Sequence, residues 1–123
     1  MDELFGDPIS TYTWEQAVED GVLVRAPDKL CEEAGYRVPV LLSAGLSDRL
    51  EVPESWQSVE SFTGRLWDVL WMGWLAIKTS KPGVNPLRFQ VIVTNNMTHR
   101  KERLTLLIGF NGEVMTITFP EEN

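Results

Sequence analysis

The sequence predicts an α+β fold in which a C-terminal three-stranded antiparallel meander is packed against a tryptophan-rich helix. Apolar residues follow helical spacing over residues 66–77, and they alternate with polar residues in the segments after Pro86. The Asn111-Gly112 pair is typical of a tight turn between two antiparallel strands. The length of 123 residues matches one domain, so we expect a single α+β domain over residues 1–123.

The N-terminal part of the chain predicts a short helix followed by a strand. Thr13 is the expected N-cap, because Gln16 three residues later completes a capping box. Gly21 supplies the left-handed residue that ends this helix. Residues 22–24 are Val-Leu-Val, a short apolar run that we expect to be a strand.

A second helix and a second strand are expected next. Asp28 follows a proline and begins a helical turn, which Gly35 ends. Residues 36–43 have the composition of a strand, but Pro39 cannot donate a hydrogen bond to a neighbouring strand, so we expect an edge strand. The segment SAGLSDRLEV then predicts a brief helix that stops at Pro53.

The stretch GRLWDVLWMGWLAI predicts a long amphipathic helix that is capped by Ser58 or Ser61 and ends near Lys78. At 100° per residue, one apolar stripe contains Leu66, Leu70, Trp74 and Ile77. A second stripe beside it contains Trp67, Trp71 and Leu75. Gly73 is expected to let another element approach closely. The apolar run is shorter than the roughly 20 residues that span a bilayer, so we expect a core helix, part of whose surface is open to an oligomer or partner interface.

The last third of the chain predicts the three strands of the meander. Residues 87–94, 103–110 and 113–119 are rich in β-branched and aromatic side chains. Asn111-Gly112 predicts a type I′ turn between the second and third strands, because such a turn needs positive φ at both of its central residues. A longer polar loop is expected between the first and second strands.

The charge of the chain is unevenly distributed. Residues 1–60 carry 13 acidic and 4 basic side chains, a net −9, whereas residues 61–123 carry 5 acidic and 7 basic ones, a net +2. An acidic chain is a poor non-specific ligand for nucleic acid, since phosphate contacts dominate that affinity. The composition therefore favours a protein partner, such as a basic nucleic-acid-binding complex, over direct binding of nucleic acid.

The motifs of common enzymes are missing from the sequence. His99 is the only histidine and Cys31 the only cysteine, which is too few for a zinc site, and Glu32 and Glu33 disfavour a reactive thiolate at Cys31. Neither a phosphate-binding loop nor a dinucleotide fingerprint is found. We therefore predict no catalytic residues, no cofactor and no metal, and we treat the basic segment His99–Arg103 as a solvated loop.

Four stretches together resemble one family: LFGDPISTYTWEQAVEDGVLV, GRLWDVLWM, RFQVIV and ITFPEE. The family consists of small uncharacterised proteins that are carried by plasmids, integrative elements and phages. The resemblance implies an accessory gene of a mobile element, a class that includes inhibitors of restriction and CRISPR defence. It implies no catalytic residues.

The leading hypothesis is a non-enzymatic binding protein that inhibits a host defence complex through its acidic surface. The residues predicted to bind the partner are Glu15, Glu19, Asp20, Glu32 and Glu33. The N-terminus MDELFGDP has neither the basic nor the apolar region of a signal peptide, so we expect a cytoplasmic protein that does not enter a membrane.

Two other readings remain open at the level of the sequence. The first is a small enzyme or ligand-binding domain, with Arg65 and Asp68 at the edge of a pocket beside the tryptophan-rich helix. The second is a homodimeric structural module. A deep pocket with paired polar groups favours the first of these readings, and a convex acidic face favours the acidic binding protein.

Overall fold

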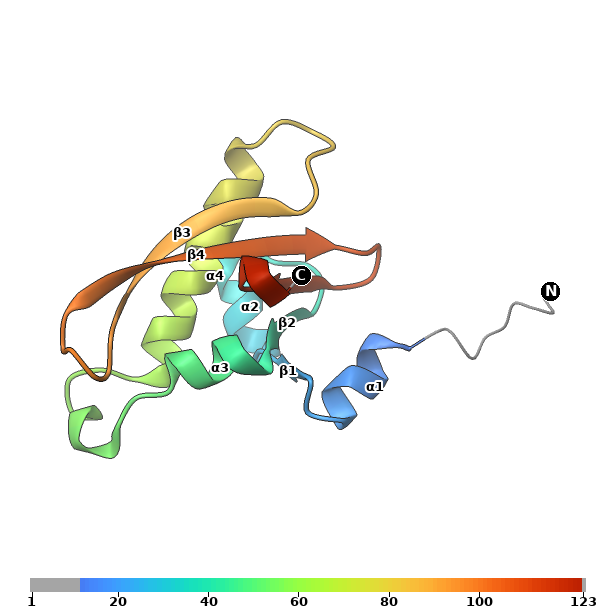
Figure 1. Ribbon diagram of the computed structural model, residues 1–123. Coiled ribbons are helices and arrows are strands. Elements are labelled where there is room, and N and C mark those ends of the chain that lie inside the picture. Colours follow the sequence, from blue (N-terminus) through green and yellow to red (C-terminus); the bar gives the residue numbers. More distant parts are fainter. Residues whose placement is uncertain (1–11, 123) are drawn as a thin grey trace.

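The computed structural model describes residues 12–122 and shows an α+β fold with a five-stranded mixed sheet (Figure 1). The helices are α1 (Trp14–Glu19), α2 (Asp28–Ala34), α3 (Ala44–Leu50) and α4 (Phe62–Thr79). The strands are β1 (Leu23–Arg25), β2 (Val40–Ser43), β3 (Leu87–Thr94), β4 (Lys101–Phe110) and β5 (Met115–Thr118). Two short 3₁₀ turns are η2 (Glu54–Trp56) and η3 (Pro120–Glu122). The N-terminal stretch at residues 1–8, from which we expected no signal peptide, lies outside the described residues.

The strands are ordered β1-β2-β5-β4-β3. The predicted meander is confirmed, since β3 pairs antiparallel with β4 and β4 pairs antiparallel with β5. The sheet continues beyond it, because β5 pairs in parallel with β2 and β2 pairs antiparallel with β1. The N-terminal strands therefore extend the C-terminal meander into one sheet.

The predicted edge strand at residues 36–43 is wrong. β2 lies between β1 and β5, and all four of its side chains are buried. Pro39 precedes the strand, and its carbonyl accepts a hydrogen bond of 3.0 Å from the Met115 backbone N–H. The proline thus removes no donor from the interior of the strand, which is the condition under which proline is tolerated next to a sheet.

The predicted hairpin lies at Asn111, but the type I′ turn is wrong. β4 ends at Phe110 and β5 begins at Met115, so four residues form the loop. Gly112 has φ +100°, whereas Asn111 is not among the residues with positive φ. The Asn111 side chain instead accepts hydrogen bonds from the backbone N–H groups of Glu113 and Val114, which stabilises the longer turn.

The predicted ends of the helices are confirmed. Thr13 and Gln16 form the capping box of α1, and Gly35 ends α2 in the left-handed conformation. Ser61, not Ser58, caps α4 by accepting a hydrogen bond of 2.9 Å from the Gly64 backbone N–H. The helix ends one residue after Lys78, close to the predicted end before Pro82-Gly83.

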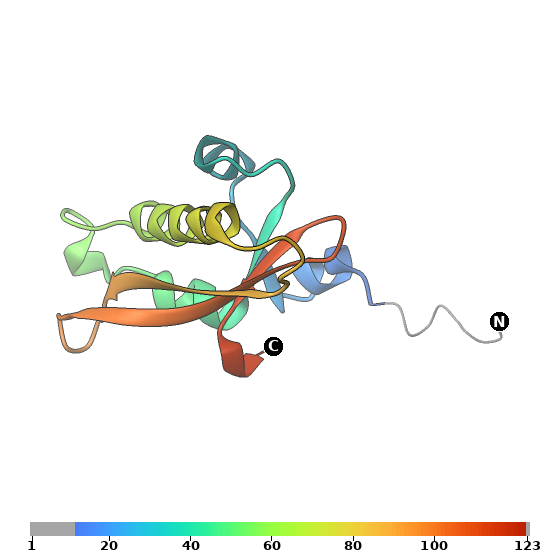
Figure 2. The same ribbon diagram turned by 90° about the horizontal axis from the view of Figure 1, so that it is seen from above.

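The helix α4 covers the sheet, with α2 on the same side (Figure 2, yellow-green and teal). Its buried residues are Arg65, Leu66, Val69, Leu70 and Gly73. The buried stripe is therefore rotated from the predicted one, since Trp74 and Ile77 are only partly buried. Gly73 faces the sheet and Tyr36, which confirms the expected close approach.

Candidate functional site

Three predicted acids are exposed at α1: Glu15 and Glu19 lie on the helix, and Asp20 is its C-cap. The Tyr12 hydroxyl donates a hydrogen bond of 2.6 Å to Asp20, and this bond to a carboxylate raises the pKa of Tyr12. Trp14 donates from its indole nitrogen to Glu113, at 2.9 Å, and so ties α1 to the β4–β5 loop. The four carboxylates Glu15, Glu19, Asp20 and Glu113 form what we call the α1 acidic surface.

Glu113 is not among the residues that the sequence predicts to bind a partner. It is 99 positions away from Trp14, and no local pattern connects the two. Its only signal in the sequence is its place directly after the Asn111-Gly112 turn, which predicts exposure but says nothing about α1.

The other two predicted acids, Glu32 and Glu33, are exposed on α2 and do not join the α1 acidic surface. The strand β1 separates the two helices along the chain, and both views place α1 apart from α2 (Figures 1 and 2). Arg25 lies between the two helices, because it forms a salt bridge of 3.1 Å with Asp28 of α2 and its guanidinium lies 5.6 Å from the centre of the Trp14 ring of α1. The five predicted partner-binding residues therefore occupy two separate surfaces.

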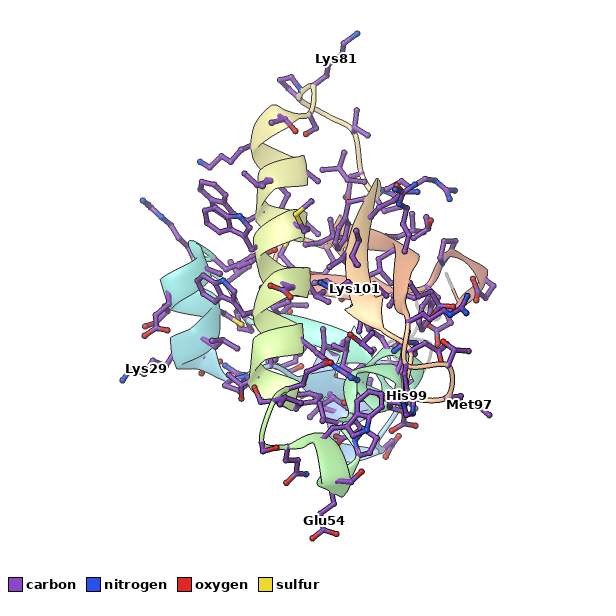
Figure 3. All side chains as sticks on the ribbon, turned by 90° about the vertical axis from the view of Figure 1, so that its left-hand side faces the viewer. Lys29, Glu54, Lys81, Met97, His99 and Lys101 are labelled. Carbon is purple, nitrogen blue, oxygen red and sulfur yellow. The ribbon has the colours of Figure 1, made fainter. Side chains whose placement is uncertain are left out.

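A groove runs between α4 and the outer side of β3, where Figure 3 shows Lys101 lying between the helix and the sheet. One part of this α4–β3 groove has a volume of about 680 Å³ and lies beside the first turns of α4. A second part of about 570 Å³ lies further along the helix. Asp68 lines both parts, and its pKa is raised by burial, an effect that the nearby charge of Lys101 opposes.

Arg65 lines the first part of the groove, but its side chain is buried and hydrogen-bonded to other residues of the chain. Only 4% of its surface is exposed, and its guanidinium donates to Glu60 at 2.9 Å and to the Glu51 carbonyl at 3.0 Å. The contact with Arg65 lowers the pKa of Glu60, which burial by itself would raise. Arg65 and Asp68 do lie at one pocket, as predicted, but Arg65 joins α4 to the end of α3.

The three tryptophans of α4, two from the second predicted stripe and Trp74 from the first, form an aromatic stack. Trp67 and Trp71 are stacked with ring centroids 6.2 Å apart, and Trp71 and Trp74 with centroids 5.3 Å apart. The Lys78 ammonium lies 5.3 Å from the centre of the Trp74 ring, within the range of a cation–π contact. Trp71 remains 40% exposed and the neighbouring Met72 37% exposed, so this stripe is only partly covered.

The single cysteine and the single histidine lie on different elements of the fold. Cys31 is buried in α2, and its pKa is raised to about 11, chiefly by burial and next by the charge of Asp28. His99 lies at the tip of the β3–β4 hairpin (Figure 3). Its ring packs edge-on against the ring of Trp56, with the two ring centroids 4.4 Å apart. Within residues 12–122, no group of three or more potential ligands among His, Cys, Asp and Glu is placed to hold a metal ion.

The chain was compared with protein-family models, with curated proteins and with solved structures. None of them matches significantly. In the described part of the chain, no helix has both the length and the apolar content needed to cross a bilayer.

Proposed function

We propose that this protein is a non-enzymatic cytoplasmic binding protein whose α1 acidic surface binds a basic surface of a partner protein. The observation that carries the proposal is that Glu15, Glu19 and Asp20 are exposed within six consecutive residues of α1 and its C-cap, while Trp14 ties Glu113 to the same helix. No salt bridge among residues 12–122 involves any of these four. A basic group does lie near α1, because the Arg25 guanidinium is 5.6 Å from the centre of the Trp14 ring. The four carboxylates have no salt-bridge partner among residues 12–122, so we take their charge to be available to a partner.

A basic nucleic-acid-binding protein fits this surface best. Its cationic channel has evolved to hold a polyanion, and opposite charge on the two partners steers their encounter. The resemblance to proteins of mobile elements directs the search to host defence complexes of the restriction or CRISPR type. In this proposal the protein masks its partner and does not itself bind nucleic acid.

Affinity capture from a host extract, followed by mass spectrometry, identifies the partner, and binding kinetics at two salt concentrations test the surface. The test variant is Glu15→Lys/Glu19→Lys, which reverses two exposed charges of α1. The matched control is Glu32→Lys/Glu33→Lys, which makes the same change of charge on α2. We expect the first variant to lower the association rate more than it raises the dissociation rate.

The same experiment contains the result that would defeat the proposal. Binding should weaken as salt rises, because salt screens exposed charges over about 8 Å at physiological ionic strength. Salt-independent binding, or equal losses in the two double variants, would contradict a specific role of the α1 acidic surface. Circular dichroism of both variants checks that α1 remains folded.

A second candidate is the binding of a small ligand in the α4–β3 groove. It is favoured by the volume of about 680 Å³ and by the opposite charges of Asp68 and Lys101 at its wall. A ligand that enters this part of the groove should change the fluorescence of Trp67, which also lines it. A screen of small polar compounds that leaves the emission and the melting temperature unchanged would argue against this candidate.

A further inference from the structure

Asn111 and Gly112 lie in the loop between β4 and β5 and carry two groups that can react with each other. The side-chain amide of an asparagine and the backbone nitrogen of the next residue are so few bonds apart that they can close into a succinimide ring. Residues Asn111 to Glu113 are exposed, so water reaches the amide. Asn111 is also the only asparagine of the chain that a glycine follows.

Gly112 leaves its backbone nitrogen accessible to this amide. Its φ of +100° lies in the left-handed region, and a β-carbon placed there would meet no atom within 4 Å. Because Gly112 has no side chain, nothing of its own shields its nitrogen from the neighbouring amide carbon. Within residues 12–122, no acceptor takes a hydrogen bond from the Gly112 N–H, so this nitrogen is not held elsewhere.

Two donors hold the amide oxygen of Asn111. The backbone nitrogens of Glu113 and Val114 lie 2.9 Å and 3.0 Å from this oxygen. When a nitrogen attacks the amide carbon, negative charge develops on the oxygen, and backbone N–H groups aimed at it stabilise the transition state. The turn therefore has its donors in place before the reaction begins.

Asn95 provides a comparison within the same chain. Its side-chain oxygen likewise accepts hydrogen bonds from the backbone N–H groups two and three residues ahead, at 2.8 Å and 3.1 Å. The next residue, however, is Asn96, whose side chain shields the backbone nitrogen, and the Asn95 amide nitrogen donates to Glu102 at 3.3 Å. Among the described residues, no such contact holds the amide nitrogen of Asn111. The two turns thus differ in the attacking nitrogen and in the leaving group.

The remaining asparagines are placed less favourably. Asn85 precedes Pro86, whose nitrogen carries no proton to lose, so the same neutral ring cannot form there. The Asn96 amide nitrogen donates to the Glu51 carbonyl at 2.8 Å, and the residue after Asn96 has a side chain. Asn123 lies outside the described residues. Within residues 12–122, the structure therefore favours reaction at Asn111.

We propose that Asn111 is a site of self-modification, at which the folded protein loses the side-chain amide without an enzyme. The Gly112 nitrogen attacks the side-chain carbonyl carbon of Asn111 and gives up its proton. The new C–N bond replaces the bond to the amide nitrogen, which takes up a proton and leaves as ammonia. Water then opens the succinimide at either of its carbonyl groups, so the products are aspartate and isoaspartate. In sum, an amide and water become a carboxylate and an ammonium ion, with no oxidant or reductant.

The products change the surroundings of the loop. The new carboxylate lies two residues before Glu113, which accepts the indole N–H of Trp14 and belongs to the α1 acidic surface. In isoaspartate, the former side-chain carbonyl has become part of the backbone, so the turn can no longer form with the two hydrogen bonds that Asn111 accepts. The modification does not depend on the proposed function, since the reaction needs no partner.

Incubation of the folded full chain at mildly alkaline pH tests the proposal. Mass spectrometry of proteolytic peptides locates each amide that has become an acid, and we expect Asn111 to lose its amide while Asn95 keeps it. Asn111→Asp supplies the aspartate product directly, as the reference for the charge of the modified chain on an ion-exchange column. A second sample, unfolded in urea, shows how Asn111 reacts without the turn.

Gly112→Asn is the test variant, because asparagine adopts positive φ more readily than most residues with side chains, and the added β-carbon has no neighbour within 4 Å. It gives Asn111 the same following residue as Asn95, so the loss of the Asn111 amide should slow, with a near-native circular dichroism spectrum. If Asn111 keeps its amide in the folded chain, whether or not the unfolded chain loses it, the proposal is overturned. Equal rates at Asn111 and Asn95, or in Gly112→Asn and the wild type, would overturn it as well.

Discussion

The contact between Gly73 and Tyr36 allows a sharp test of how α4 sits on the sheet. The buried Tyr36 hydroxyl donates a hydrogen bond of 2.7 Å to the Leu70 carbonyl. A β-carbon on Gly73 would lie 2.9 Å from this hydroxyl oxygen, but 3.4 Å from Ile108 and from Phe89. Only the hydroxyl contact is shorter than van der Waals distance. The methyl group of Gly73→Ala should therefore clash only with the Tyr36 hydroxyl oxygen.

The size of the effect follows from two opposing terms. Replacing glycine by alanine inside a helix stabilises it by about 1 kcal/mol, while overpacking a core costs about 1 to 3 kcal/mol. Because the Tyr36 hydroxyl is held by Leu70, the ring cannot move away freely, and we expect a net loss of about 1 to 2 kcal/mol. Tyr36→Phe by itself removes one buried hydrogen bond and should cost about 1 kcal/mol.

The double variant Gly73→Ala/Tyr36→Phe tests whether the Tyr36 hydroxyl limits how closely α4 approaches the sheet. Without the hydroxyl, the new methyl group has room, so Gly73→Ala in the Tyr36→Phe background should be neutral or stabilising by up to about 1 kcal/mol. Urea denaturation of the four proteins measures the coupling, which we expect to be about 2 kcal/mol. If Gly73→Ala costs the same in both backgrounds, within about 0.5 kcal/mol, the hydroxyl is not what limits the approach of the helix.

Two further predictions concern the core. Leu70→Ala should lower the free energy of unfolding by about 2 to 5 kcal/mol, because Leu70 is fully buried between α4 and the sheet; a loss below about 0.5 kcal/mol in urea denaturation would contradict this placement. The Cys31 thiol should resist a thiol reagent at pH 8 until urea unfolds the chain, and rapid labelling of the native protein would be inconsistent with its burial. Burial raises the pKa of the Cys31 thiol to about 11, from the ordinary value of about 9, so the folded state holds the thiol proton more tightly than the unfolded state. The contribution of this group to the free energy of unfolding is therefore complete below pH 9 and is lost as the pH rises towards 11. Cys31→Ala should not show this loss.

Several features of the fold were predictable from the sequence because they depend on neighbouring residues. The capping box at Thr13 and the left-handed Gly35 act within one helical turn, and both helices end where these residues predict. The alternation of apolar residues in β3 reports burial on one face of a strand, and its predicted bounds agree with the structure. The helical spacing in α4 likewise identified a core helix.

Other features depend on which segments meet, and these were decided by the tertiary structure. Whether β2 is an edge or a central strand depends on its pairing with β5, which is more than 70 positions away, and Pro39 is compatible with both because it precedes the strand. The face of α4 that becomes buried is the one that meets Tyr36 and the sheet at Leu70 and Gly73, and the helix's own sequence does not specify these neighbours.

For the candidate binding surfaces too, some features follow from the local sequence and others only from the tertiary structure. The exposure of Glu15, Glu19 and Asp20 follows from the amphipathic pattern of α1, so the sequence by itself determined that these acids face solvent. The sequence could not show that Glu113 joins them, nor that β3 remains unpaired on one side. A side chain's exposure follows from local periodicity, whereas its neighbours follow from long-range strand pairing and helix packing, for which the local sequence carries no signal.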